Sequence, residues 1–220
     1  MGMNDYLIFG ASGLTGNNFL KEVKDKGGSY HLFVRSLIED EEADKQTIFC
    51  QENIEELPLS KNLIICLGYP LAFQELIWMN EETKRAFKEV DLELVLEIAR
   101  KAKDIGVHNI AVISAVGSRL NSLNYYLNIK AEMEQKILDL KFKKTFFAKP
   151  GHLLGFRDDS RIDNWVRVIE FLGKIYGYFM IGPLKKYRNV EAKQVAKELF
   201  KVINDDNEIA YNYLVEVNEG

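Results

Sequence analysis

Cysteine, histidine and proline are scarce in this chain, and their scarcity excludes several classes of protein. The 220 residues include 2 cysteines, 3 histidines and 4 prolines, without repeats or low-complexity linkers. Two cysteines cannot form a disulfide scaffold, and we expect Cys50 and Cys66, at the ends of apolar runs, to be reduced core thiols. His31, His108 and His152 have no metal-ligand spacing with one another or with the cysteines, so we expect no metal site.

Long apolar runs and a strong charge of either sign are also absent. No run approaches the ~20 apolar residues of a membrane-spanning helix. The first residues do not resemble a secretory signal, and Tyr6 stands where a myristoylation signal has Ser or Thr. The net charge of -4 gives no reason to expect nucleic acid or an anionic membrane as a partner. We therefore expect a cytoplasmic protein whose partner is a small-molecule substrate.

Strand-like apolar runs alternate with helix-like patterns along the chain. Strands are predicted at 6–9, 31–34, 47–50, 63–67, 110–113 and 145–148, and helices at 14–26, about 80–104, about 123–140 and about 190–204. The acidic segment 37–46 is expected to be a solvated connection or a short helix. Alternation of this kind predicts the α/β class, with a Rossmann-type doubly wound parallel sheet.

The chain is predicted to be a single domain over 1–220. The aromatic-rich stretch within about 153–187 is interpreted as a small lobe that covers a substrate, although its aromatic residues are equally compatible with core packing. The alternating run 209–215 is typical of an edge strand.

A glycine motif directly follows the first predicted strand and opens the first predicted helix. Its members are Gly10, Ala11, Ser12, Gly13, Leu14, Thr15 and Gly16. Glycines let the backbone turn tightly beside a pyrophosphate, and the helix directs its N–H groups and positive dipole end toward that charge. A plain glycine-rich turn is the structural alternative, but the strand-to-helix context favours a dinucleotide site.

Arg35 and Ser36 close the second predicted strand, where a dinucleotide-binding unit meets the adenosine ribose. An acidic residue at this position would repel a 2′-phosphate, whereas a guanidinium binds its oxygens. The pattern therefore favours NADP(H) over NAD(H), with a surface arginine at a strand end as the alternative.

Two further strand ends carry residues that we expect to line the cofactor. Leu67 and Gly68 follow the fourth predicted strand, where a glycine lets the chain pass close to a ligand. The other group follows the sixth predicted strand and consists of Pro150, Gly151, His152 and Leu153. His152 faces the same edge in this interpretation, although a structural or solvent-facing histidine is the more common role.

Ser114, Tyr126 and Lys130 form the predicted catalytic set. Ser114 ends the fifth predicted strand, and Tyr126 and Lys130 lie one turn apart on the helix that follows. A neighbouring ammonium favours the phenolate and lowers the pKa of a tyrosine toward the working range. Lys130 is also predicted to bind the nicotinamide ribose, and Ser114 to hydrogen-bond a substrate carbonyl.

Together these residues resemble the atypical branch of the short-chain dehydrogenase/reductase superfamily, and most closely the Tat-interacting-protein-30-like NAD(P)-binding oxidoreductases. The resemblance rests on 10–16, Arg35, 66–68, Val90, Asp91, Ser114, 126–130, Glu132, Glu134, Pro150, Gly151 and Arg161. It implies that Ser114 orients a carbonyl, Tyr126 is the acid/base and Lys130 lowers its pKa. Two departures are Lys149, where the family commonly has Arg, and Gln51-Glu52, where many relatives have an acidic residue for the adenine.

Three functions remain open on this basis. The first is an NADP-dependent oxidoreductase that acts on a small carbonyl or alcohol. The second is a catalytically silent NADP(H)-binding sensor or protein-interaction module, since fold alone does not fix function. The third is an epimerase or dehydratase with tightly held NAD, which Arg35 disfavours. Either a monomer or a homodimer is compatible with the sequence.

Overall fold

The computed structural model describes residues 2–49, 56–72, 74–150, 153–154 and 190–205. Its strands are β1 (Asn4–Phe9), β2 (Tyr30–Val34), β3 (Gln46–Ile48), β4 (Ser60–Ile65), β5 (Asn109–Ile113), β6 (Lys144–Ala148), β7 (Leu153–Leu154) and β8 (Val190–Glu191). Its helices are α1 (Leu14–Asp25), the 3₁₀ turn η1 (Ala43–Lys45), α2 (Glu81–Lys88), the π-helical turn η3 (Glu89–Leu94), α3 (Val95–Asp104), α4 (Tyr125–Asp139) and α6 (Ala192–Asn204).

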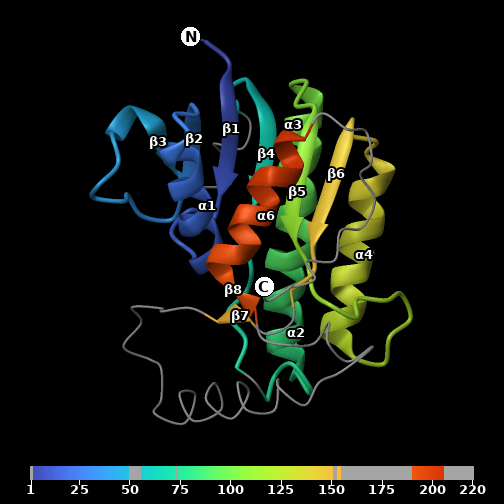
Figure 1. Cartoon of the computed structure of the whole chain (residues 1–220). Coiled ribbons are helices and arrows are strands. Elements are labelled where there is room, and N and C mark those ends of the chain that lie inside the picture. The colour runs from blue at the N-terminus through green and yellow to red at the C-terminus, as the bar shows by residue number, and fades with distance from the viewer. Residues whose placement is uncertain (1, 50–55, 73, 151–152, 155–189, 206–220) are drawn as a thin grey trace, which may run out of the picture.

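Six parallel strands form the main sheet in the order β3-β2-β1-β4-β5-β6, and β7 pairs with β8 separately. This is the doubly wound dinucleotide-binding order, in which the chain reverses direction across the sheet between β1 and β4. The carboxyl ends of the strands all lie at the lower edge in Figure 1. The predicted fold class is therefore confirmed.

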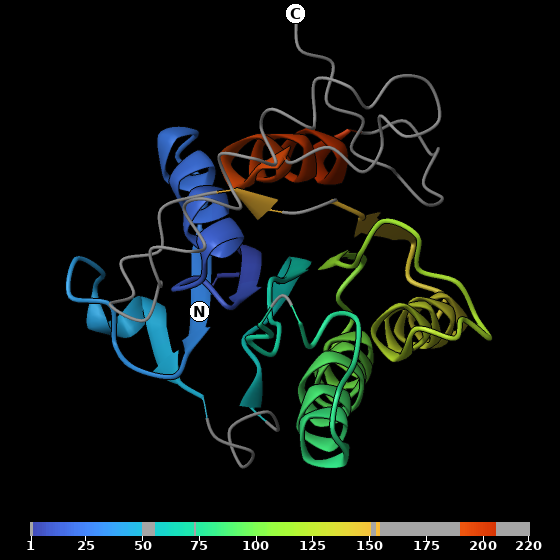
Figure 2. The same cartoon turned by 90° about the horizontal axis from the view of Figure 1, so that it is seen from below.

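Helices cover both faces of the sheet. Seen from below in Figure 2, α1 and α6 lie on one face, and α2, α3 and α4 lie on the other. Fully buried side chains such as Phe19 and Val195 belong to the α1–α6 face, whereas Phe87, Ile98 and Met133 belong to the opposite face. The central strands are consequently apolar on both faces, as parallel strands between two helical layers must be.

Two predictions on the elements need correction. The helix predicted at about 80–104 is interrupted by the π-helical turn η3, which a periodicity argument cannot detect. The strand predicted at 47–50 is β3, which ends at Ile48, and Cys50 lies outside the described residues. The stretches 155–189 and 206–220, which include most of the predicted lobe and the final strand, also lie outside them. Among the described helices, none has the length and apolar character needed to cross a membrane.

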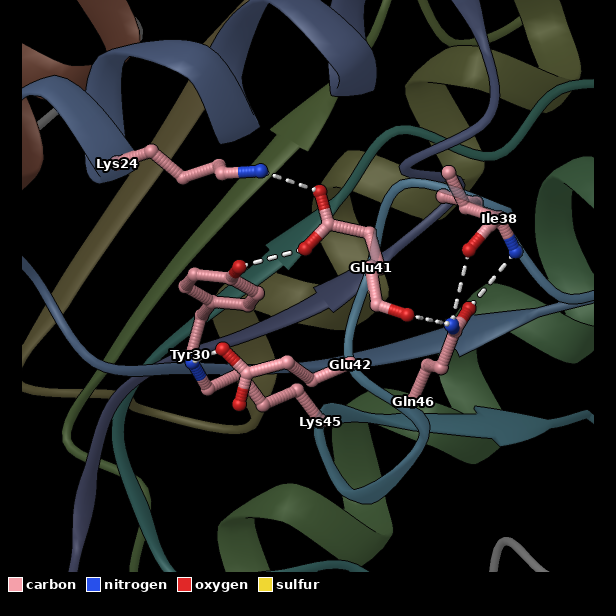
Figure 3. A network of polar contacts seen from close by, with 7 residues as sticks. All are labelled: Lys24, Tyr30, Ile38, Glu41, Glu42, Lys45 and Gln46. Atoms are coloured by element: carbon pink, nitrogen blue, oxygen red, sulfur yellow. Dashed lines mark hydrogen bonds and ion pairs between the residues drawn. The ribbon is translucent and has the colours of Figure 1, made fainter.

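The acidic segment 37–46 is anchored rather than simply solvated (Figure 3). Glu41 has a side chain only 5% exposed, and it accepts hydrogen bonds from Lys24 Nζ at 2.8 Å and the Tyr30 hydroxyl at 2.6 Å. The Gln46 side chain closes the segment by bonding the backbone of Ile38 and Glu41. A single buried carboxylate therefore connects α1, β2 and the segment that leads into β3.

Burial alone would raise the pKa of Glu41, but the hydrogen bonds from Lys24 and Tyr30 outweigh burial, and the pKa is lowered below the usual 4.5. A carboxyl with a depressed folded-state pKa stabilises the protein above its unfolded pKa, and this contribution is lost as pH falls through the folded value. The stabilisation from Glu41 is therefore complete near neutral pH and disappears in acid.

We expect Glu41→Gln to lower the free energy of unfolding near neutral pH by about 1–2 kcal/mol, because two hydrogen bonds to a charge are weakened. Urea unfolding measures the change. The matched control is Glu42→Gln, whose exposed pair with Lys45 should contribute less than about 0.5 kcal/mol. Equal effects of the two substitutions, or a Glu41→Gln effect that persists in acid, would contradict this account.

Candidate functional site

The glycine loop lies at the switch point between β1 and β4. Gly10 has a φ of +83°, and a Cβ there would lie 2.6 Å from the Cys66 carbonyl oxygen. A Cβ at Gly16 would lie 2.1 Å from the Gly10 carbonyl oxygen. Only glycine therefore lets the loop pass against the end of β4 and lets α1 begin so close to β1.

The first turn of α1 offers unpaired backbone donors to an anion. Gly13 is the N-cap residue without a side-chain cap, and the first turn contains no acidic residue. The N–H groups of Leu14, Thr15 and Gly16 belong to the first turn, where a helix provides no acceptor of its own. The loop between Phe9 and Leu14 also contains the buried Ala11 and the exposed Ser12. The seven predicted loop residues are thus brought together in a geometry suited to a phosphate.

Arg35 and Ser36 lie beside this loop. They follow β2 directly and are exposed, and the register that pairs Phe9 with Phe33 brings the ends of β1 and β2 together. Within the described ranges, Arg35 forms no ion pair. Its side chain is exposed at this end of the sheet.

Lys130 and Asp91 form a buried ion pair at the carboxyl end of the sheet. Lys130 Nζ lies 2.7 Å from Asp91 Oδ1, with side chains 5% and 2% exposed. The ammonium also donates to the Ile113 carbonyl at 3.1 Å, and Asp91 Oδ2 accepts from the Tyr69 N–H at 2.7 Å. Burial alone would lower the pKa of Lys130, but Asp91, together with Tyr126 and Glu134, outweighs burial and the pKa is raised.

Asp91 belongs to η3, and sequence reasoning gave it no role. A π-helical turn changes the directions of the side chains along a helix, and such turns are frequent at functional sites. The signal that points to Asp91 is an acidic residue within an otherwise apolar helical face, but its partner Lys130 lies on another helix. Only the packing of η3 against α4 joins them.

The pair also links the candidate catalytic residues to the glycine loop. A Cβ built on Gly68 would lie 3.8 Å from Asp91 Oδ1, and the Cys66 carbonyl, two residues earlier, contacts Gly10. Leu67 and Gly68 thus occupy the predicted place between the two parts of the site. The observed bonds along this path are the Cys66 N–H to the Phe9 carbonyl at 2.9 Å, the Tyr69 N–H to Asp91, and the Asp91–Lys130 ion pair.

Tyr126 lies in the first turn of α4, and its ring centroid is 5.3 Å from that of Phe87. Its pKa is raised rather than lowered, which corrects the prediction from the Tyr-x-x-x-Lys pair. Burial is the largest cause, Lys130 acts in the expected lowering direction, and the Asp91 carboxylate opposes it. The phenol therefore keeps its proton at neutral pH in this arrangement.

Ser114 is engaged differently from the prediction. Its hydroxyl donates to Glu134 Oε1, and the same oxygen accepts from the Ser118 hydroxyl at 2.7 Å. Lys149 Nζ lies 2.7 Å from the other carboxylate oxygen. Sequence reasoning gave Glu134 no role, although its position four residues after Lys130 places it on the same face of α4. The predicted bond from Ser114 to a substrate carbonyl stays a prediction.

The remaining predicted residues fall into two groups. Pro150 is buried and accepts a hydrogen bond from the Val116 N–H at 3.0 Å, which joins the loops after β5 and β6. Leu153 begins β7 and pairs with Val190 of β8. Gly151 and His152 lie outside the described residues.

Cys66 agrees with its prediction as a reduced core thiol. It is unbridged and packs against the apolar cluster of the α1–α6 face. Burial raises the pKa of Cys66 to about 12, so the thiol stays protonated and unreactive. His31 Nε2 lies 2.8 Å from Thr47 Oγ1 on the neighbouring strand, which gives that histidine a structural partner.

Comparison of sequences finds relatives among fungal proteins, whereas no family model matches the chain. Protein FMP52-1, mitochondrial, of Scheffersomyces stipitis is 37% identical over 75 residues, which are 34% of this chain and 33% of that protein. The match thus spans a third of that relative. Protein FMP52, mitochondrial, of Eremothecium gossypii is 29% identical over 175 residues, 77% of this chain and 75% of that protein.

Comparison of structures finds dinucleotide-binding proteins with low sequence identity. MoeE5 in complex with UDP-glucose and NAD has a TM-score of 0.73 at 11% identity, over 97% of this chain and 76% of that one. Human epimerase family protein SDR39U1 with NADPH has a TM-score of 0.68 at 13% identity, over 96% of this chain and 73% of that chain. A short-chain dehydrogenase/reductase superfamily protein from Agrobacterium tumefaciens with bound NAD has a TM-score of 0.69 at 10% identity, over 96% and 77%.

Two consequences follow from the comparisons. The chain has the fold of these dinucleotide-binding structures, one of which is described as a short-chain dehydrogenase/reductase superfamily protein, so the fold that the resemblance implied is confirmed. The expectation of a cytoplasmic protein is contradicted, because the sequence relatives are named as mitochondrial proteins. Composition and the absence of a secretory pattern do not distinguish these two compartments.

We expect Asp91→Asn to destabilise the protein by about 3–5 kcal/mol near neutral pH, because the substitution leaves the Lys130 ammonium buried without its anion. An unpaired buried ammonium has a folded-state pKa below its unfolded value, so the stability of the variant should rise with pH. The parent protein should show the opposite pH dependence. Because the folded-state pKa of Lys130 is raised above the usual 10.5, its protonation stabilises the folded state below pH 10.5, and this stabilisation is lost as the pH rises through the folded-state pKa.

Urea unfolding at about pH 7 and about pH 9.5 separates these behaviours. Glu89→Gln is the matched control, since Glu89 is an exposed carboxylate in the same π-helical turn. A variant at Asp91 that is as stable as this control would show that the pair does not hold the site together.

Proposed function

We propose that the protein is an NADP(H)-dependent oxidoreductase of the short-chain dehydrogenase/reductase type, acting on a small carbonyl or alcohol. The observation that carries the proposal is the buried Lys130–Asp91 pair, which is bonded to the segment after β4 through the Tyr69 N–H, beside the glycine loop that follows β1. This arrangement supports a site in which the glycine loop binds the phosphates and Tyr126 with Lys130 transfers the proton. Ligands of open α/β sheets bind at the carboxyl ends of the strands, at the switch point.

The residues present fit a dinucleotide with a 2′-phosphate. The first turn of α1 suits the pyrophosphate, and the exposed Arg35 with Ser36 suits the phosphate on the adenosine ribose. Among structures with this fold, human SDR39U1 is described with NADPH and MoeE5 with NAD, so both cofactors occur on it. Arg35 is the feature of this chain that favours NADP(H).

Tyr126 and Lys130 suit proton transfer in the reducing direction. The raised pKa of Tyr126 keeps the phenol protonated at neutral pH, so it can donate a proton to a carbonyl oxygen. When bound, the reduced cofactor supplies the hydride. The Lys130 ammonium has three donors, of which Asp91 and the Ile113 carbonyl take two, and the third is left for a ribose hydroxyl.

A second candidate function is a dinucleotide sensor without turnover. It is favoured by the way that Lys130 and Ser114 are already occupied by Asp91 and Glu134. A sensor needs the glycine loop and Arg35 but has no use for Tyr126 as an acid. The names of the sequence relatives point to mitochondria as the compartment in which either function operates.

We expect Arg35→Ala to weaken NADPH binding by about tenfold or more, with little change for NADH, because only NADPH presents the 2′-phosphate. Isothermal titration calorimetry with both cofactors measures the selectivity. Arg100→Ala is the control, since Arg100 is an exposed arginine of α3. Equal affinity of the parent protein for the two cofactors would remove Arg35 from the site.

We expect Tyr126→Phe to retain NADPH binding and to lose turnover by about a hundredfold or more, the usual contribution of a positioned general acid. Consumption of NADPH with a panel of aldehydes, ketones and sugars gives the readout. The control is Tyr125→Phe, because the neighbouring hydroxyl bonds only the Lys84 carbonyl among the described residues. A Tyr126→Phe variant as fast as the parent would refute the mechanism, and a parent that binds NADPH without turnover would favour the sensor.

A further inference from the structure

Glu134 connects three segments that meet at the carboxyl ends of β5 and β6. Its carboxylate on α4 receives hydrogen bonds from Ser114 and Ser118, which lie in the loop after β5. The carboxylate also forms an ion pair with Lys149, the residue that follows β6, whose Nζ lies 2.7 Å from Glu134 Oε2. The loop after β5 is also joined to the end of β6 by the Ser114 N–H to the Ala148 carbonyl at 2.7 Å, and to the loop after β6 by the Val116 N–H to the Pro150 carbonyl at 3.0 Å.

The network is closed and buried, as a charge in a protein interior requires. Glu134 is 7% exposed and Ser114 is 3% exposed. An ionised carboxylate can only accept hydrogen bonds, and here it has two hydroxyl donors and one ammonium. Both serine protons must therefore point toward Glu134, and Ser114 is left with lone pairs only for any other partner.

The position of this network relates it to one half of a dinucleotide. The glycine loop and Arg35 lie at the ends of β1 and β2, on one side of the switch point. A dinucleotide that spans the crevice therefore places its nicotinamide half beyond β4, toward β5 and β6. Glu134 holds the two loops that end these strands, one turn of α4 after Lys130.

We infer that Glu134 and Lys149 are positioning residues for the nicotinamide half of the site, which fix Ser114 as a hydrogen-bond acceptor. The inference rests on the proposed dinucleotide site. Glu134 acts through the loop that it holds rather than by contact with the cofactor. Lys149 acts by neutralising Glu134, so an arginine, which also forms charge-assisted hydrogen bonds to a carboxylate, should serve as well as the lysine does.

The experiment compares two ligands that share the adenosine end. Calorimetry gives the dissociation constants of NADPH and of adenosine 2′,5′-bisphosphate, which lacks the nicotinamide half, for the full chain. Glu134→Gln and Lys149→Met should each weaken NADPH binding by about tenfold, the effect expected from loss of one charge-assisted hydrogen bond. Both variants should bind the bisphosphate with the parental dissociation constant. Lys149→Arg should retain parental affinity for both ligands.

Two further variants keep the test decisive. Glu132→Gln is the matched control, because Glu132 is on the same helix and pairs only with Lys136 among the described residues. Ser118→Ala removes one hydrogen bond without a change of charge, and it should raise the dissociation constant of NADPH by about threefold. It provides a readout if the variants that unbalance the charge fail to fold.

The outcomes separate the inference from the function on which it rests. A parent protein that binds neither ligand refutes the proposed dinucleotide site itself. A parent that binds both, with variants that weaken both ligands equally or neither, overturns the inference and leaves the dinucleotide site standing. Selective loss of NADPH affinity with retention in Lys149→Arg is the result that the inference requires.

Discussion

Two opposite charges buried side by side determine how the carboxyl end of this sheet is built. Transfer of the Lys130 ammonium or the Asp91 carboxylate alone from water would cost several kcal/mol, so each is stable there only with the other. Their contact fixes η3 against α4, and the second Asp91 oxygen fixes the segment after β4 through the Tyr69 N–H. Lys130 in turn holds the end of β5 through the Ile113 carbonyl.

The same pair sets the chemistry available at this edge. Burial raises the pKa of Tyr126, and although the Lys130 ammonium acts in the lowering direction, the Asp91 carboxylate opposes it. The Tyr126 hydroxyl therefore stays protonated near neutral pH. A second buried pair, Glu134 with Lys149, performs a similar task for the loops after β5 and β6. The site is therefore electrically balanced before any ligand arrives.

The fold and the position of the glycine loop follow from local patterns and could be predicted. Apolar runs, the glycine spacing and the arginine at the end of β2 can each be recognised within a short stretch of the sequence. The partners of buried charges are not local: Asp91 meets Lys130, and Glu134 meets Lys149, only after helices pack on the sheet. For this reason the role of Ser114 as a donor to Glu134 and the raised pKa of Tyr126 could not be derived from spacing.

The prediction of a cytoplasmic protein was wrong for a different reason. Net charge and mean composition describe the surface that a protein shows to water, and this surface is similar for soluble proteins of several compartments. The relatives named as mitochondrial proteins supply information that these averages do not contain.

A crystal structure of the protein with NADP⁺ would test the proposed site. We expect the pyrophosphate on the N–H groups of Leu14, Thr15 and Gly16, the 2′-phosphate on Arg35, and the nicotinamide ribose on Lys130 with the Asp91 contact intact. A cofactor bound at this edge with its nicotinamide away from Tyr126 would contradict the proposed catalysis. A structure in which Lys130 leaves Asp91 to reach the ribose would contradict the view that the buried pair is the fixed frame of the site.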